Sequence, residues 1–341
     1  MSAPVAVLGA GNWGTGVAQL AALAGNDVRL WSRSAAQCEE LNTAHTNKKY
    51  TGDAALSDRI VATTDLRAAV LGASPILMIV PSKAFREVAR ALGDFATPDL
   101  VLLHGTKGLE RETHKRMSEL LAEETCIRQL GVVSGPNIAT EILAGKPAGT
   151  VVASHFPRVV EEGRRALAGP GLRLFTSDDV RGVEYAGAFK NVVAIAAGMA
   201  DALAVGENAK AMLVTRGIAE MARLAAFLGA SPHVFFGMAG LGDLITTCAS
   251  PFSRNHRLGA ALVKGLSLDE AVKSLGMVAE GVNTARAAHE LVHGHHVDLP
   301  LFERVYRVVH HGLAPDAALR ELMRLPVGID IDRALFRPGA P

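Results

Sequence analysis

A glycine-rich turn near the start of the chain constrains the fold more than any other feature. The segment Gly9–Gly14 reads GAGNWG, follows the apolar run Val5–Leu8 and precedes a stretch with helical periodicity. A G-x-G-x-x-G pattern between a strand and a helix is typical of the first βαβ unit of a dinucleotide-binding sheet. Gly9 would permit the tight turn, Gly11 the close approach of backbone to a pyrophosphate, and Gly14 the packing of helix on strand. A tight turn without a ligand is the alternative.

The rest of the first half alternates short β-rich runs with amphipathic helical stretches, which is the signature of parallel βαβ units. Further strands are expected at 27–31, 75–80, 100–104, 132–134, 150–153 and 172–175, and helices at 84–92 and 115–124. From about Asp179 the β-rich runs disappear and long Ala-rich segments follow. The sequence therefore predicts an α/β protein with a Rossmann-like, doubly wound parallel sheet in residues 1–180 that binds a dinucleotide. An all-α, substrate-binding domain is expected in residues 181–341.

The composition narrows the class of protein. The 35 Lys and Arg residues nearly balance the 34 Asp and Glu residues, so no overall field draws the chain to nucleic acid or to an anionic membrane. The three cysteines are too few for a disulfide framework, and the first residues lack a signal-peptide pattern. The longest apolar run, which begins at Val192, is too short to span a membrane. We expect a globular, cytoplasmic protein with no nucleic-acid or membrane partner.

The end of the second expected strand bears on the choice of cofactor. An NAD-specific sheet usually places Asp or Glu there against the ribose 2′-hydroxyl. This chain has Trp31-Ser32-Arg33 instead. Arg33 could pair with a 2′-phosphate through its planar guanidinium, so the sequence favours NADP(H) and leaves NAD(H) as an alternative. A solvated surface arginine is the other interpretation.

One lysine lies in an unusually apolar helical segment. Gly182–Ala200 carries only two charged residues, Glu184 and Lys190. A buried ammonium is unfavourable unless it is paired or used in chemistry. Lys190 is therefore a candidate proton donor whose pKa would be lowered by burial and by a second cation. The alternative is a lysine whose stem packs while its ammonium reaches water.

Several polar turns could complete a pocket. Ser253 and Arg254 precede an expected helix, where an N-capping serine, free N–H groups and a guanidinium suit a phosphate. An ordinary solvated helix start is the alternative. The turns His104–Gly108 and Ser134–Asn137 follow strands, at the sheet edge where open α/β proteins bind ligands. Asp243 begins another helix and is either a plain cap or a carboxylate that orients a partner.

The run His289–His293 matches the HExxH pattern of zinc hydrolases. The third histidine that a metzincin needs six residues later is absent, because Leu299 occupies that position. We therefore expect a partly exposed helix end and no catalytic metal site. Because His295 and His296 lie nearby, weak adventitious metal binding is the alternative. Cys248 has no histidine near it in sequence and is expected to be a small packed residue.

Taken together, the sequence resembles the bacterial-type NAD(P)-dependent sn-glycerol-3-phosphate dehydrogenases. The resemblance runs from residue 5 to about residue 325 and rests on the motifs GAGNWGT, VPS, TKGLE, SGPN, FKNVVAIAAGM, GMAGLGDL, SRN and VAEG. It implies a reversible hydride transfer between NAD(P)H and dihydroxyacetone phosphate. The product would be sn-glycerol 3-phosphate, which feeds glycerophospholipid synthesis.

The resemblance also implies roles for individual residues. Lys190 matches the catalytic lysine, and we expect Asp243 and Asn191 to hold its amine. The positions that match substrate contacts are Lys107, Gly135, Asn137, Lys190, Asp243, Ser253, Arg254 and Asn255. With the glycines of the turn, the cofactor positions are Gly9, Gly11, Asn12, Trp13, Gly14, Arg33, Tyr50, Lys107, Ala139, Arg254, Val278 and Glu280. Two positions depart from the bacterial pattern, since Asn137 stands where Ser or Thr is common and Thr140 where Lys is common.

Two other functions stay open at this point. One is a related NADP-dependent reductase of hydroxy or keto acids, against which the phosphate-type donors at Ser253–Asn255 argue. The other is a non-catalytic NADP(H) sensor, which has no need to bury Lys190 in an apolar helix. The oligomeric state is open as well, although helical hairpins rich in small residues could support a homodimer.

Overall fold

Eight strands in the first half of the chain form one sheet in the order β3-β2-β1-β4-β5-β6-β7-β8. The computed structural model describes residues 3–276, 279–326 and 330. The strands are β1 (Val5–Leu8), β2 (Val28–Trp31), β3 (Ile60–Thr63), β4 (Ile76–Met78), β5 (Val101–His104), β6 (Gln129–Ser134), β7 (Ala148–Ala153) and β8 (Leu172–Ser177). Neighbouring strands run parallel except β6 and β7, which are antiparallel. The α/β class and the doubly wound, mostly parallel sheet are thereby confirmed.

One strand was not expected from the sequence. β3 is a four-residue strand at the edge of the sheet, and its residues alternate between buried and exposed positions. Val61 in its middle is largely exposed. A short strand with only one buried face gives a weak pattern of apolar residues, which is why this strand was missed.

Helices cover both faces of the sheet. One face packs against α1 (Asn12–Leu23), α2 (Ala35–Thr43) and α8 (Pro157–Leu167), and the other against α4 (Leu66–Val70), α5 (Ser82–Gly93) and α6 (Met117–Glu124). Along β1, Val5 and Val7 join the first core while Ala6 and Leu8 join the second. Strand β4 lies beside β1 on the side away from β2, so the winding direction reverses between them. In open α/β sheets, ligands bind at the carboxyl ends of the strands at such a point.

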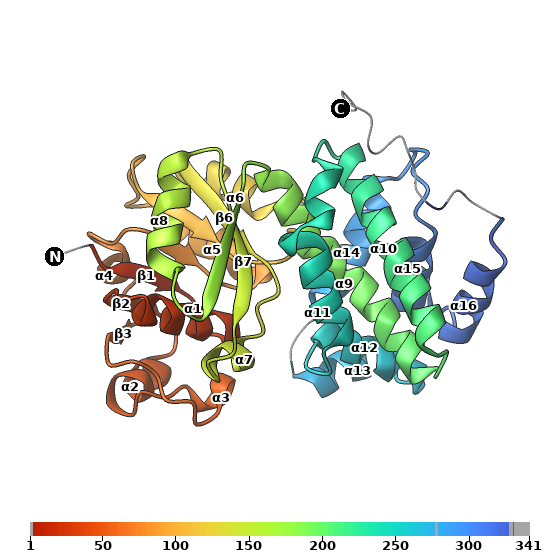
Figure 1. Cartoon of the computed structure of the whole chain (residues 1–341), viewed down its shortest axis with the longest axis horizontal. Helices are drawn as coiled ribbons and strands as arrows, with labels where there is room; N and C mark the ends of the chain where they lie inside the picture. Colours follow the sequence, from red (N-terminus) through yellow and green to blue (C-terminus); the bar gives the residue numbers. More distant parts are fainter. Residues whose placement is uncertain (1–2, 277–278, 327–329, 331–341) are drawn as a thin grey trace. The chain divides into compact units, whose positions relative to one another are not determined.

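The chain separates into two compact units, shown in Figure 1. The first, here called the sheet unit, comprises Met1–Thr106 and Lys115–Val180. The second, the helical unit, comprises Lys107–His114 and Arg181–Pro341. The short helices α3 (Lys48–Thr51) and α7 (Ala139–Leu143) belong to the sheet unit.

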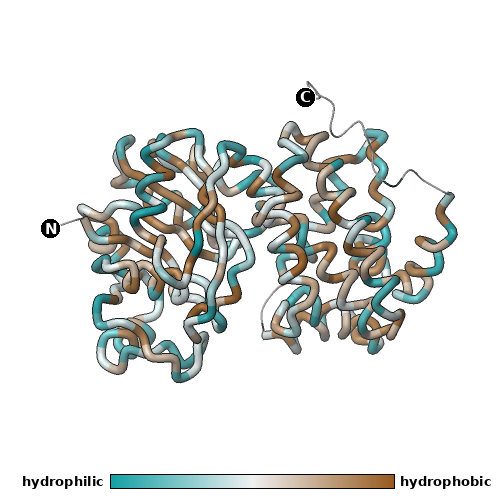
Figure 2. Tube along the Cα trace, in the orientation of Figure 1, coloured by the Kyte–Doolittle hydropathy of each residue, from teal (hydrophilic) through white to brown (hydrophobic). Residues whose placement is uncertain are grey.

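A long buried helix forms the centre of the helical unit. α9 (Val180–Ala202) is buried at every residue from 182 to 200, as expected for a helix that is apolar nearly all round. The other α-helices are α10 (Glu207–Phe227), α11 (Asp243–Ala249), α12 (Arg254–Val263), α13 (Leu268–Leu275), α14 (Glu280–Leu291), α15 (Pro300–His311) and α16 (Pro315–Met323). In Figure 2, apolar and polar residues alternate along these helices, so that each contributes one apolar stripe to the core.

α12 packs directly on the backbone of α9. A Cβ atom on Gly259 would lie 2.0 Å from the carbonyl oxygen of Ile195, too close for any side chain. This contact allows the start of α12 to lie beside the middle of α9, where Lys190 and Asn191 are found.

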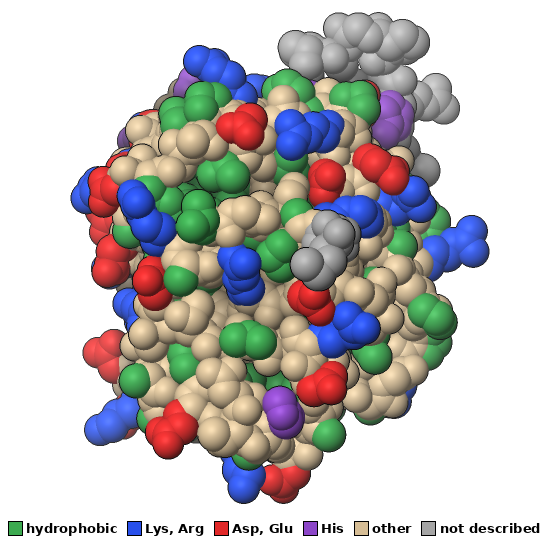
Figure 3. All heavy atoms as spheres, turned by 90° about the vertical axis from the view of Figure 1, so that its left-hand side faces the viewer, with side chains coloured by type: hydrophobic (Ala, Val, Ile, Leu, Met, Phe, Trp, Pro, Cys, Tyr) green, Lys and Arg blue, Asp and Glu red, His purple; other side chains and the backbone are tan. Residues whose placement is uncertain are grey.

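Charged side chains of both signs are interspersed on the face of the sheet unit that Figure 3 shows. Lys and Arg side chains on this face lie among Asp and Glu side chains rather than in a patch of one sign. Within the described ranges, no helix has both the length and the apolar character needed to cross a bilayer.

Candidate active site

The glycine turn between β1 and α1 has the backbone geometry of an anion-binding loop. Gly9 has φ +113°, a conformation that residues with a Cβ rarely adopt. A Cβ on Gly14 would lie 1.8 Å from the carbonyl oxygen of Gly9, so only glycine permits this tight start of the helix. The N-cap of α1 is Gly11, which makes no side-chain capping bond. Because Gly11 has no side chain, it cannot cap the N–H groups of the first helical turn.

The candidate residues at the end of β2 and on α3 lie at the surface of the sheet unit. The Arg33 side chain is 65% exposed and its guanidinium lies 4.0 Å from the carboxylate of Glu87. Tyr50 lies on α3 with the Lys49 ammonium 5.3 Å from its ring centroid. An exposed guanidinium agrees with both interpretations of Arg33, as a contact to a 2′-phosphate and as a solvated side chain.

Buried polar atoms without hydrogen-bond partners lie on the candidate residues of this unit. They are Nε1 of Trp13, Oγ of Ser134 and Oδ1 of Asn137. The amide group of Asn137 donates to Oγ1 of Thr150 at 3.0 Å, and Gly135, two residues before it, has φ +150°. Ala139 begins α7 and is buried, whereas Thr140 is exposed. Because buried polar atoms are usually satisfied, these atoms are suitable partners for the polar groups of a bound ligand.

In the helical unit, two lysines share one buried carboxylate. Lys190 is 5% exposed, and its Nζ donates to Oδ1 of Asp243 at 2.6 Å. Lys107 donates to the other oxygen, Oδ2, at 2.7 Å. Asp243 is 2% exposed and begins α11, while Gly242 occupies the N-cap position. The snorkelling interpretation of Lys190 and the plain-cap interpretation of Asp243 are therefore wrong.

The electrostatics of this cluster favour a lysine that can lose its proton. Burial, opposed by the negative charge of Asp243 and assisted by the positive charge of Lys107, lowers the pKa of Lys190 to about 8. The lowered pKa means that Lys190 can both donate and accept a proton near neutral pH. A buried lysine with a lowered pKa beside a carboxylate and a second cation is a candidate for proton transfer.

A second polar chain links α9, α12 and α14. Oδ1 of Asn191 accepts from Nδ2 of Asn255 at 2.9 Å, and Oδ1 of Asn255 accepts from the N–H of Gly281 at 3.0 Å. The amide group of Asn191 donates to the carbonyl oxygen of Lys107 at 3.4 Å and to that of Gly187 at 3.3 Å. The expectation that Asn191 holds the Lys190 amine is therefore corrected, because its side chain is engaged by these other groups.

Comparison with known proteins identifies the family. Residues 4–159 match the model of the NAD-dependent glycerol-3-phosphate dehydrogenase N-terminus, and residues 179–320 that of its C-terminus. A glycerol-3-phosphate dehydrogenase [NAD(P)+] of Exiguobacterium sp. is 42% identical over 327 residues, which cover 95% of this chain and 96% of the relative. The chain belongs to the NAD-dependent glycerol-3-phosphate dehydrogenase family.

Solved structures agree with this membership. The glycerol-3-phosphate dehydrogenase of Coxiella burnetii has a TM-score of 0.90 at 36% identity, covering 95% of this chain and 99% of that one. The enzyme of Saccharomyces cerevisiae has a TM-score of 0.84 at 28% identity, covering 95% of this chain and 100% of that one. As a member of the glycerol-3-phosphate dehydrogenase family, the protein is an oxidoreductase that acts on a CH–OH group and uses NAD(P).

The remaining candidates of this dehydrogenase lie at two helix starts. Oγ of Ser253 accepts from the N–H of His256 at 3.3 Å, so the predicted N-cap of α12 is confirmed. Arg254 is the first residue of α12 and is exposed. Glu280 begins α14, while Val278 lies outside the described residues.

Thr247 is a site residue that the sequence analysis missed. Its Oγ1 accepts from Nζ of Lys190 at 2.7 Å and donates to the carbonyl oxygen of Asp243 at 2.6 Å. Thr247 lies four residues after Asp243 on α11, so both face the same side of that helix. This spacing is the signal that could have identified it.

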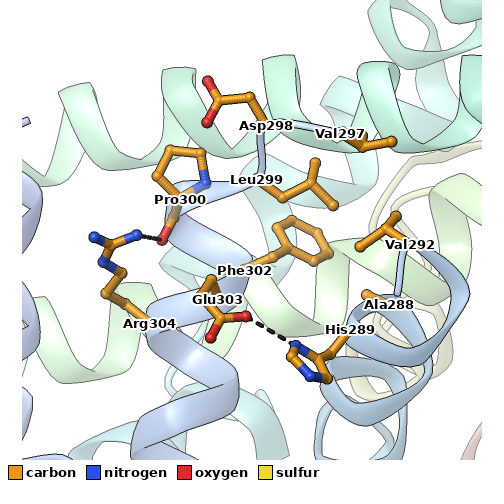
Figure 4. A pocket seen from close by; sticks show the side chains of 10 residues that line it. All are labelled: Ala288, His289, Val292, Val297, Asp298, Leu299, Pro300, Phe302, Glu303 and Arg304. Carbon is orange, nitrogen blue, oxygen red and sulfur yellow. Dashed lines mark hydrogen bonds and ion pairs between the residues drawn. The ribbon is translucent and has the colours of Figure 1, made fainter. Parts of the chain in front are cut away.

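The HELVH run contributes to helix packing in this dehydrogenase. Figure 4 shows His289 directed at Glu303, and its Nδ1 lies 2.9 Å from the carboxylate. The same imidazole stacks on Tyr306 at 4.0 Å, so it joins α14 to α15. A cavity of about 240 Å³ lies beside these residues. In the described part of the chain, no three His, Cys, Asp or Glu side chains gather in a way that could hold a metal ion.

Proposed function

We propose that this member of the family reduces dihydroxyacetone phosphate to sn-glycerol 3-phosphate with NAD(P)H, and catalyses the reverse reaction, to supply glycerophospholipid synthesis. The observation that carries the proposal is the buried Lys190 ammonium, bonded to Asp243 at 2.6 Å with Lys107 on the other carboxylate oxygen. Neither a non-catalytic NADP(H) sensor nor a purely structural lysine needs such a cluster. The motif SRN at Ser253–Asn255 favours a phosphorylated substrate over a carboxylate.

In this mechanism Lys190 moves the proton. When bound, the nicotinamide of the cofactor supplies the hydride. Lys190 stabilises the negative charge that develops on the ketone oxygen and donates a proton to it. In the reverse direction the neutral amine accepts the proton of the hydroxyl group, which its pKa of about 8 permits. Asp243 and Thr247 orient the amine, and Lys107 favours its deprotonation.

The phosphate of the substrate would be bound at the start of α12. Arg254 supplies a guanidinium there, and the helix supplies the positive end of its dipole. Asn255 holds the same turn against α9 through Asn191. Lys107, Gly135, Asn137 and Asp243 are the further substrate contacts that we propose.

The cofactor would be bound by the glycine turn of the sheet unit. Gly9, Gly11 and Gly14 bring the backbone to the pyrophosphate, and Arg33 pairs with the 2′-phosphate, so that NADP(H) is preferred and NAD(H) is accepted. The further cofactor contacts proposed are Asn12, Trp13, Tyr50, Lys107, Ala139, Arg254, Val278 and Glu280. In this assignment residues 1–180 are the dinucleotide-binding domain and residues 181–341 the substrate-binding domain.

The setting that we propose is cytoplasmic, because the cysteines Cys38, Cys126 and Cys248 are all free thiols. The proposed partner is the small phosphorylated substrate, without nucleic acid or membrane. A homodimer formed through the helical unit is proposed on the exposed apolar residues Met212 and Phe227 of α10. Light scattering that gave the mass of one chain would refute the dimer.

The activity is tested by following the loss of NADPH absorbance with dihydroxyacetone phosphate and, separately, with uncharged dihydroxyacetone. We expect rapid oxidation with the phosphorylated ketone and poor turnover of the uncharged one. Equal turnover of both ketones would contradict the phosphate site. The absence of turnover with either ketone, in protein that binds NADPH, would contradict the assigned reaction.

A further inference from the structure

A buried amide side chain lies behind the glycine turn of the sheet unit. Asn47 precedes α3 and is 0% exposed. Its Nδ2 donates to the carbonyl oxygen of Ala10 at 3.0 Å and to Oγ1 of Thr15 at 2.8 Å. Nε2 of Gln37 donates to the same Ala10 oxygen at 2.6 Å and to Oδ1 of Asn47 at 3.0 Å. Two side-chain amides from outside the turn therefore converge on one of its carbonyl groups.

The next carbonyl of the turn is held by a relay through Thr15. Oγ1 of Thr15, which accepts from Asn47, donates to the carbonyl oxygen of Gly11 at 2.8 Å. The N–H of Thr15 donates to the same oxygen at 2.9 Å. The carbonyl groups of Ala10 and Gly11 thus each accept two hydrogen bonds from the protein interior.

These bonds determine where the N–H groups of the turn point. In a trans peptide the C=O and N–H groups point in opposite directions. Holding the Ala10 carbonyl inward directs the N–H of Gly11 outward, and holding the Gly11 carbonyl inward does the same for Asn12. These N–H groups belong to the glycine turn that the proposed function assigns to the pyrophosphate.

We propose that Asn47, together with Gln37, is a positioning residue for the cofactor, which fixes the amides of the glycine turn in the orientation that binds the pyrophosphate. The inference rests on the proposed function in assigning Gly9–Gly14 to NAD(P)(H). Both hydrogens of each side-chain amide are already donated within the network, so Asn47 and Gln37 act through the turn and make no contact with the phosphates.

Loss of this network should affect NADH and NADPH affinity differently from loss of Arg33. The pyrophosphate is common to NADH and NADPH, whereas Arg33 reads only the 2′ position. Oε1 of Gln37 accepts from Oγ of Ser32 at 2.6 Å, so the network also reaches the residue before Arg33. A loss that is equal for the two cofactors would therefore distinguish Asn47 from an effect passed on to Arg33.

The test is Asn47→Ala in the full-length protein, with cofactor binding measured by fluorescence titration. We expect Kd to rise about tenfold for NADPH and by the same factor for NADH, because a turn with free carbonyls samples other orientations. At saturating cofactor, kcat and the KM for dihydroxyacetone phosphate should stay as in the wild type. ADP-ribose, which contains the pyrophosphate, should bind more weakly, whereas adenosine 2′-phosphate, which lacks it, should bind as before.

Asn42→Ala is the matched control. Asn42 lies in the same unit, and its side chain makes two hydrogen bonds to the backbone of Ala62, at 2.9 and 2.7 Å. Its loss should lower the melting temperature and leave both cofactor affinities unchanged. If Asn47→Ala behaves in the same way, Asn47 is only structural and the inference is wrong.

Thr15→Val tests the relay with little change in shape. It retains the N–H bond to Gly11 but removes the hydroxyl, so we expect a smaller, few-fold rise in Kd for both cofactors. If Asn47→Ala does not fold, an unchanged Kd in Thr15→Val overturns the inference. A loss confined to NADPH in either variant also overturns it. Failure of the wild-type protein to bind either cofactor would instead overturn the proposed function.

Discussion

The sheet unit and the helical unit differ in the chemical groups with which they would bind a ligand. In the sheet unit the glycine turn presents backbone N–H groups, and the charged candidate Arg33 is mostly exposed. In the helical unit the central groups are the buried charges of Lys190 and Asp243. Replacing a side chain leaves the backbone N–H of that residue in place. Replacing one member of a buried ion pair leaves the other charge without a partner, which is strongly unfavourable. Side-chain substitutions should therefore change the rate through the helical unit and the cofactor affinity through the sheet unit.

The largest effect is expected at Lys190. Lys190→Met retains the volume of the stem and removes the charge, so turnover should fall by about 10² to 10⁴, the usual contribution of a placed general acid. The Kd for NADPH should stay nearly the same, and this is measured by fluorescence titration. Turnover above about a tenth of the wild-type value would show that Lys190 serves packing alone.

Arg254→Ala should act on the substrate's phosphate. Removing one charge-assisted pair costs about 2 to 4 kcal/mol, so kcat/KM for dihydroxyacetone phosphate should fall roughly thirtyfold to a thousandfold. Turnover of dihydroxyacetone, which lacks the phosphate, should hardly change. NADPH affinity, measured in parallel because Arg254 is also a proposed cofactor contact, and melting temperature are the controls. If both ketones suffer equally while these controls stay normal, the start of α12 is not the phosphate site.

Arg33→Ala should show the weaker, cofactor-specific effect expected of the sheet unit. A charged contact with the 2′-phosphate contributes about 1.5 to 3 kcal/mol, which is tenfold to a hundredfold in NADPH affinity. NADH affinity should stay unchanged. An equal loss for NADH and NADPH would show that Arg33 does not read the 2′ position.

The pH dependence should report the coupling between Lys107 and Lys190. With the pKa of Lys190 at about 8, ketone reduction should slow as the pH rises through that value, because the ammonium is lost. Oxidation of glycerol 3-phosphate should accelerate over the same range. Lys107→Met removes a cation that lowers this pKa. The fall in kcat for ketone reduction and the rise in kcat for glycerol 3-phosphate oxidation, the two limbs of the pH profile, should therefore both move to higher pH. An unchanged position of the limbs would contradict the coupling.

The smallest effect on activity is expected at Glu220, a buried carboxylate of the helical unit outside the lysine cluster. Its carboxylate accepts from the N–H groups of Leu301 and Phe302 at 2.9 to 3.0 Å. Burial raises its pKa to about 7, while these N–H groups and Arg223 lower it and Asp298 raises it.

The pKa of Glu220 is higher in the folded protein than in the unfolded chain, so protonated Glu220 contributes to the free energy of unfolding. This contribution is complete at acid pH and is lost as the pH rises through about 7. Glu220→Gln should abolish this loss, which is on the order of 1 to 3 kcal/mol between about pH 5 and 8. Denaturant unfolding at several pH values measures it. An equal pH dependence in both proteins would show that Glu220 does not titrate in this range.

The sequence predicted the parts of the site whose signal is local. The glycine turn, the N-cap Ser253 and the apolar helix around Lys190 each occupy one short segment, so their residue types and spacing sufficed. Asn47 was missed because its partner Ala10 lies 37 residues away, beyond the reach of any spacing rule. Only one of the two hydrogen-bond partners of Lys190 was predicted. Asp243 was recognised by its family motif, whereas Thr247, one helical turn later, was overlooked.

The segment Lys107–His114 has a consequence for how this protein can be divided or recombined. It groups with the helical unit although it lies between two stretches of the sheet unit, and it is held at both ends, by Lys107 on Asp243 and by His114 on Glu290. A graft of residues 181–341 from a relative would bring a foreign Asp243 and Lys190 to the native Lys107. The ion cluster is thus inherited in two separate pieces of the gene, and only an exchange that includes both pieces transfers it intact.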